Sequence, residues 1–284
     1  MRANRISYLN CHVEFQYASR SSRVQKSSRG THFRLKQLSP THALGGPKSY
    51  WQVSRSHRYS LLFALPLLVF YELLEALSPV RAQGGVIRNG ADVVLTGLFT
   101  WMFGIRGPLV FMALVIGVAL WLIRRDRSTG PLRSSVFARM FGESLLLSLV
   151  VGVVVGTATV QLIGPLRSLA AGGGLNGTPL ERLTLSIGAG LYEELLFRVV
   201  IVALLANGFR LLGASRLLGG AFATLIGALL FSAFHYIGSL GEPFRLESFV
   251  FRALAGLVFS ALYLLRGFGV TAWTHALYDI AVLM

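Results

Sequence analysis

Among the ionisable side chains that lie within apolar stretches of the C-terminal third, six are candidates for chemistry. Placing a charge at the centre of a bilayer costs about 2.5–3.5 kcal/mol on insertion scales, so such residues are functional candidates. They occur in three segments, which read AGLYEELLFR, FSAFH and HALYD. The six residues are Glu193, Glu194, Arg198, His235, His275 and Asp279. Carboxylates and imidazoles in this combination indicate acid–base chemistry on a water molecule.

Helical spacing sorts the first segment into two roles. Glu194 and Arg198 are four residues apart, so they share a helix face and can form an ion pair. Glu193 lies about 100° further round the helix and is free to face another neighbour. We therefore expect Glu194 and Arg198 to organise the site and Glu193 to act as a general base.

The two histidines complete the predicted site. His235 is expected to partner Glu193 on the water molecule. His275 and Asp279 are also four residues apart, and a carboxylate beside an imidazole fixes the ring and favours its protonated form. We predict that this pair is electrophilic or stabilises an oxyanion, a role whose loss costs about 10²–10³-fold in rate.

Apolar stretches of the length needed to cross a bilayer must position these residues. Most approach the ~20 residues that a spanning helix requires, and without water to bond to they should be helical. The stretches are 59–77, 108–123, 143–164, 183–206, 219–237, 248–265 and 269–284. A shorter stretch, 91–105, is interfacial, re-entrant or an eighth span. The sequence therefore predicts an all-α polytopic membrane bundle of seven or eight helices with a polar intramembrane cavity.

Composition agrees with a membrane protein. The 284 residues are 54% hydrophobic and only 14% charged, whereas an ordinary soluble domain has roughly 25% charged residues. This excludes a typical soluble enzyme, and the single cysteine excludes a disulfide scaffold. The tail lacks the coupled aromatic and basic pattern of a nucleic-acid-binding protein, so no such partner is expected.

The net charge of +15 is concentrated at the N-terminus. Residues 1–58 hold 11 Lys and Arg residues and one acid. We predict a disordered, Ser/Arg-rich tail that is a lipid-binding cytoplasmic arm, an organelle transit peptide or an overextended reading frame. Residues 59–182 would be N-terminal spans and 183–284 the catalytic helices. If 91–105 does not cross, the Arg-rich loop 124–135 lies on the same side as the tail, which the positive-inside rule places in the cytoplasm.

Several other mechanisms lack their sequence landmarks. The chain has no His-Glu-x-x-His, which argues against a zincin site. No Gly-x-Ser-Gly or Gly-Asp pair lies in a span, and the run of glycines at 172–174 is not followed by the Lys-Ser/Thr of a phosphate-binding loop. Serine, di-aspartate and nucleotide-dependent mechanisms are therefore disfavoured.

The three segments together resemble a known family. Glu193-Glu194-x-x-x-Arg198, Phe231-x-x-x-His235 and His275-x-x-x-Asp279, in this order on successive helices, are similar to the motifs of the CPBP family. This family comprises the CAAX prenyl proteases of the second type and their bacterial Abi-like relatives. The resemblance covers about residues 183–283.

The resemblance implies an all-helical intramembrane endopeptidase in which a glutamate and a histidine activate water. Glu193 and His235 would be the catalytic pair, with His275 and Asp279 assisting. The eukaryotic prenyl proteases typically have Asn where this chain has Asp279, and an ionised Asp cannot donate a hydrogen bond to an oxyanion. A membrane-associated protein or peptide, of CAAX type or otherwise, would be the substrate, with no cofactor, in the bacterial inner membrane.

Two other classes of function remain open. Glu193, His235, His275 and Asp279 are adequate ligands for a divalent metal such as zinc, which would make the protein a metal-dependent membrane peptidase or a metal- or proton-coupled transporter. Alternatively, the protein is a non-catalytic membrane scaffold or immunity protein that keeps the fold.

Overall fold

A computed structural model describes residues 49–78, 88–126, 130–163, 178–238 and 241–284. Within these ranges every regular element is a helix and none is a strand, as predicted. Five described stretches are long and apolar enough to cross a membrane. They are His57–Leu77, Gly90–Arg125, Ser134–Ile163, Arg216–Phe234 and Leu246–Arg266. The chain is thus an integral membrane protein, while seven or eight crossings stays a prediction.

The stretch Gly90–Arg125 is a helical hairpin rather than one straight helix. It comprises α4 (Gly90–Phe103), the 3₁₀ turn η1 (Gly104–Arg106) and α5 (Gly107–Arg125). The two helices fold back on each other, with the rings of Phe99 and Phe111 5.3 Å apart. A Cβ at Gly107 would lie 2.3 Å from the backbone nitrogen of Thr100, so this close turn requires glycine.

Helix α4 contains most of the stretch 91–105, for which the sequence did not decide between an interfacial, a re-entrant and a spanning helix. Its 14 residues extend about 21 Å, less than the ~30 Å hydrocarbon core of a bilayer. One side of its first turn is buried: Ala91 and Asp92 are both fully inaccessible, and the N-cap Asn89 is 6% exposed. The short α4 therefore begins inside the bundle, not at its surface.

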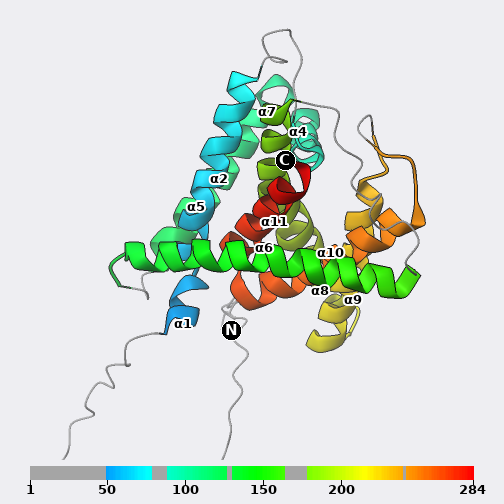
Figure 1. The fold of residues 1–284 in the computed structure, drawn as a ribbon. Helices are drawn as coiled ribbons and strands as arrows, with labels where there is room; N and C mark the ends of the chain where they lie inside the picture. The colour runs from blue at the N-terminus through cyan, green and yellow to red at the C-terminus, as the bar shows by residue number, and fades with distance from the viewer. Residues whose placement is uncertain (1–48, 79–87, 127–129, 164–177, 239–240) are drawn as a thin grey trace, which may run out of the picture. The chain divides into compact units, whose positions relative to one another are not determined.

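The C-terminal helix α11 (Phe268–Leu283) is the central element of the bundle (Figure 1). It contacts α2 (His57–Leu77), α6 (Ser134–Ile163) and α7 (Pro179–Gly188). On its other side it contacts α10 (Leu246–Arg266), while α9 (Arg216–Phe234) packs against α10. Helix α6 runs across the front of the bundle in Figure 1. This packing makes α11 a common wall for helices from both halves of the chain.

The fold begins before the predicted end of the N-terminal tail. Helix α1 (Tyr50–Ser54) begins with a capping box at Ser49. Its Val53 is only 1% exposed because it packs in a core cluster with residues of α2 and α6. Residues 49–58, assigned to the tail from composition, are therefore part of the folded unit of residues 46–284. The short apolar run around Val53 carries too weak a periodic signal to be recognised. Residues 1–48 lie outside the described residues.

Candidate active site

The Glu-Glu-x-x-x-Arg segment lies in a widened helix. After α7 the chain continues as the π-helices η3 (Ala189–Glu193) and η4 (Leu195–Val202), followed by α8 (Ala203–Leu211). Such i→i+5 geometry is rare and frequently marks functional sites. A Cβ at Gly190 would lie 2.4 Å from the carbonyl oxygen of Ala272, so glycine allows η3 to press directly against α11.

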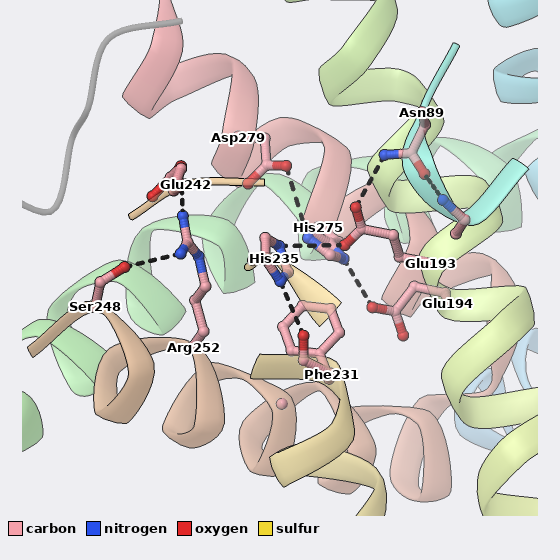
Figure 2. Close-up of polar contacts among 12 residues, drawn as sticks. Asn89, Glu193, Glu194, Phe231, His235, Glu242, Ser248, Arg252, His275 and Asp279 are labelled. Atoms are coloured by element: carbon pink, nitrogen blue, oxygen red, sulfur yellow. Dashed lines mark hydrogen bonds and ion pairs between the residues drawn. The ribbon is translucent and has the colours of Figure 1, made fainter. Parts of the chain in front are cut away.

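Glu193 is buried with one oxygen held and one free. Its Oε1 accepts a hydrogen bond of 2.9 Å from the Asn89 amide. Its Oε2 accepts no hydrogen bond from any residue within the described ranges and faces Nε2 of His235 at 4.0 Å (Figure 2). A buried acceptor left unpaired in this way is costly unless it binds water or a ligand.

His235 is held so that its outer nitrogen faces Glu193. It forms the C-cap of α9, and its Nδ1 lies 2.8 Å from the carbonyl oxygen of Phe231. Because a carbonyl can only accept, Nδ1 carries a proton, and Nε2 of the neutral ring is then an acceptor. Two acceptors cannot bond to each other, but one water molecule can donate to both. At hydrogen-bond lengths of about 2.8 Å, the 4.0 Å gap corresponds to an angle of about 90° at that water.

Glu194 connects the first and third motifs. Its Oε1 lies 3.1 Å from Nη1 of Arg198, the ion pair that the i,i+4 spacing predicts, and 2.7 Å from Nδ1 of His275. Arg198 also donates to the carbonyl oxygen of Gly256 at 3.3 Å, and its guanidinium lies 4.5 Å above the ring of Phe231. The contact between Glu194 and His275 was not predicted, since it joins helices that are distant in the sequence.

His275 lies between two carboxylates. Its Nδ1 donates to Glu194, and its Nε2 lies 3.6 Å from Oδ2 of Asp279, beyond hydrogen-bond length. The imidazole stacks on Phe259, with 4.3 Å between ring centres and 19° between planes. The ring is therefore fixed on one face and at one nitrogen, while its Nε2 faces the same region as Asp279 (Figure 2).

The site is closed on the Glu194 side and open on the side of His235 and Asp279. Glu194 and Arg198 are buried, whereas the His235 and Asp279 side chains are 25% and 22% exposed. Arg252 lies at this open side, bound to Glu242 at 2.7 Å and to Ser248 at 2.8 Å. The gap between Glu193 and His235 therefore lies next to the more exposed side of the cluster.

All six residues predicted from the sequence lie in this one cluster, and the structure adds two that were missed. Asn89 contacts Glu193 from the start of α4, and Arg252 of α10 lies beside the site, bound to Glu242 and Ser248. The signal for Asn89 was an Asn-Gly pair at the start of an apolar run, typical of an N-cap. For Arg252, the signal was a charge one turn after Ser248 inside an apolar helix.

The described residues contain no group of three or more His, Cys, Asp or Glu side chains arranged to hold a metal ion. Within the cluster, Nδ1 atoms of both histidines are occupied by a carbonyl and a carboxylate oxygen. The gap between Glu193 and His235 offers two ligand atoms rather than three. This donor set suits a bound water better than a zinc ion, which takes at least three protein ligands.

Comparison with known proteins agrees with the motifs. Residues 176–281 match the family model described as type II CAAX prenyl endopeptidase Rce1-like, and this range contains the six predicted residues but not Asn89. No curated protein and no solved structure matches the chain. The resemblance predicted from the three motifs is thereby confirmed: residues 176–281 are similar to the type II CAAX prenyl endopeptidase Rce1-like family.

Proposed function

We propose that this protein is an intramembrane endopeptidase that hydrolyses a peptide bond by means of water activated between Glu193 and His235. The observation that carries this proposal is the unpaired Oε2 of Glu193, buried and 4.0 Å from the acceptor nitrogen of His235. A carboxylate and an imidazole facing one small gap in a membrane bundle are the parts that a general-base hydrolase needs. The family match supports a peptide substrate.

In the proposed reaction, the water donates one hydrogen bond to each acceptor and loses a proton to Glu193 Oε2. The resulting hydroxide forms a bond to the carbonyl carbon of the peptide, whose oxygen becomes an oxyanion. Collapse of this intermediate breaks the C–N bond, and the proton on Glu193 passes to the leaving amine. Water is thereby divided between the new carboxyl group and the new amine, and Glu193 returns to its starting state.

The oxyanion would be stabilised by His275 through Nε2. A carboxylate at each ring nitrogen suits an imidazolium, which can donate from Nε2 while Nδ1 donates to Glu194. Asp279 then acts by electrostatics and not as a donor. Arg198 holds Glu194 in place through their ion pair, so its effect on the reaction is indirect.

We propose a membrane-associated protein or peptide as the substrate, including the lipidated C-terminal CAAX type after which the matched family is named. The partly exposed His235 and Asp279 side chains give a peptide access without unfolding the bundle. We propose no cofactor and a location in the bacterial inner membrane with a cytoplasmic N-terminus.

The test uses the full chain in proteoliposomes with an internally quenched, farnesylated CAAX peptide and its unlipidated counterpart. Wild-type protein should cleave the lipidated peptide, and Glu193→Gln and His235→Ala should not. Glu247→Gln, a change of the same kind in the first turn of α10, should cleave normally. Cleavage by Glu193→Gln at the wild-type rate would refute the proposal. Loss of wild-type cleavage on chelation, restored by zinc, would favour the metallopeptidase instead.

A further inference from the structure

Asn89 contacts the proposed general base from a distant part of the chain. It is 104 residues before Glu193 and outside the residues matched by the family model. Its side chain is buried, and its Nδ2 donates to Glu193 Oε1 at 2.9 Å (Figure 2). The N-terminal spans thus contribute a polar group directly to the Glu193 carboxylate.

The orientation of the Asn89 amide is fixed by its second role, as the N-cap of α4. Its Oδ1 accepts a hydrogen bond of 2.9 Å from the backbone nitrogen of Ala91. Because a backbone N–H can only donate, the oxygen must face Ala91, and the NH₂ group must then face Glu193. The helix cap therefore determines that a donor, not an acceptor, meets the carboxylate.

A buried network holds Asn89 itself in place. Its backbone N–H donates to the Tyr71 hydroxyl at 3.0 Å, and that hydroxyl donates to Asp92 at 2.9 Å. Arg88 pairs with Asp92 at 3.2 Å. A Cβ at Gly188 would lie 2.8 Å from the Cβ of Asn89, so glycine allows α7 to approach this network closely.

We propose that Asn89 is a positioning residue for Glu193, a role that rests on the proposed function. By occupying Oε1, it fixes the rotation of the carboxylate so that Oε2 faces His235 and the reacting water. It also leaves Oε2 as the only oxygen available to take the proton. The catalytic geometry then depends on α4 as well as on the family-matched helices.

The experiment separates the helix cap from the contact with Glu193. Ser is as good an N-cap as Asn but is too short to reach Glu193, so Asn89→Ser should keep the melting temperature. Its kcat should fall by about 10–100-fold with KM unchanged, since small misplacements of reacting groups cost up to about 10²-fold. Asn89→Asp keeps the cap but sets an oxygen against Glu193, and its kcat should fall at least as far.

Two control variants, Ser215→Ala and Glu193→Gln, separate an effect on the fold from an effect on the reaction. Ser215→Ala removes the N-cap of α9 without touching Glu193, and should lower the melting temperature but not kcat. Normal kcat in Asn89→Ser, with Glu193→Gln inactive, would overturn the role of Asn89 alone. A fall in both melting temperature and kcat in Asn89→Ser would assign Asn89 to the fold and also overturn it. No cleavage by wild type, or full cleavage by Glu193→Gln, would overturn both proposals.

Discussion

Two clusters of charge among the described residues differ in how completely their carboxylates are paired. In the first, Glu193 keeps one oxygen without a partner among the described residues and faces His235 across 4.0 Å. In the second, near α1, Glu143 is bound by both Nε and Nη2 of Arg266 and by the hydroxyl of Tyr50. Both oxygens of Glu143 are therefore occupied, whereas Glu193 has one acceptor to spare.

This difference separates the proposed catalytic carboxylate from the other by its pairing and not by its charge. The sequence places Glu143 near the end of an apolar stretch, where reaching toward the interface is cheap. In the structure its partner Arg266 is only 4% exposed, with its guanidinium 4.1 Å from the Trp51 ring. This ion pair, in which both oxygens of Glu143 are bound, joins α6 and α10, and the Tyr50 hydroxyl adds α1. Incomplete pairing, rather than burial, is what distinguishes Glu193 from Glu143.

The largest effects are expected from deleting the two carboxylates in turn. Glu193→Ala should lower turnover by at least about 10²–10⁴-fold, the range for a lost general base, with little loss of stability. Glu143→Ala should do the reverse: it leaves Arg266 buried without its partner, which costs about 3–5 kcal/mol of stability. Thermal melting and kcat per folded molecule measure both. Equal losses of stability in the two variants would remove the distinction between the clusters.

A second prediction concerns Arg198, which belongs to the candidate site but is paired like a structural residue. Arg198→Ala leaves Glu194 buried without its cation. The free energy of unfolding should fall by the several kcal/mol typical of a broken buried pair, and the yield of folded protein should fall with it. The molecules that do fold should retain part of their turnover, because His275 still holds Glu194. Size-exclusion yield and active-site-normalised kcat check this. Wild-type yield with abolished turnover would instead make Arg198 part of the chemistry.

The local parts of this architecture could be predicted from the sequence, and the contacts between distant helices could not. The i,i+4 pairs Glu194–Arg198 and His275–Asp279 follow from helical periodicity, and both are present. The bond from Glu194 to His275 depends on how η3 packs against α11, which periodicity does not specify. Likewise, the contact between Asn89 and Glu193 depends on α4 being short enough to begin inside the bundle.

The end of the N-terminal tail could not be predicted from composition, for a related reason. Composition placed residues up to 58 in a tail, because Arg55 and Arg58 continue its basic character. In the structure these arginines donate to the carbonyl oxygens of Leu264 and Gly130 and hold the start of the fold to later segments. Basic composition describes the charge of a segment but not the partners that it finds.

Two truncations sharpen the comparison at the second cluster. Removing residues 1–48 should leave insertion, melting temperature and turnover unchanged. Removing residues 1–54 also deletes α1, and with it the Tyr50 hydrogen bond to Glu143 and the buried Val53. A hydrogen bond to a charged group contributes about 1.5–3 kcal/mol, so the longer deletion should lower the melting temperature measurably. Identical melting curves would show that α1 adds nothing to the fold.

The smallest effect is expected at Asp279. It tests the proposal that His275 donates to the oxyanion while Asp279 acts only through its charge. Asp279→Asn keeps the shape of the side chain and removes its charge. The carboxylate is 3.6 Å from His275 and partly exposed, and an ion pair of this kind contributes about 0–1 kcal/mol. Turnover should therefore change by less than about tenfold, the equivalent of 1.4 kcal/mol. A loss of more than about 10²-fold, measured on the same farnesylated peptide, would mean that Asp279 takes part in proton transfer, the scale of effect seen for general acids and bases.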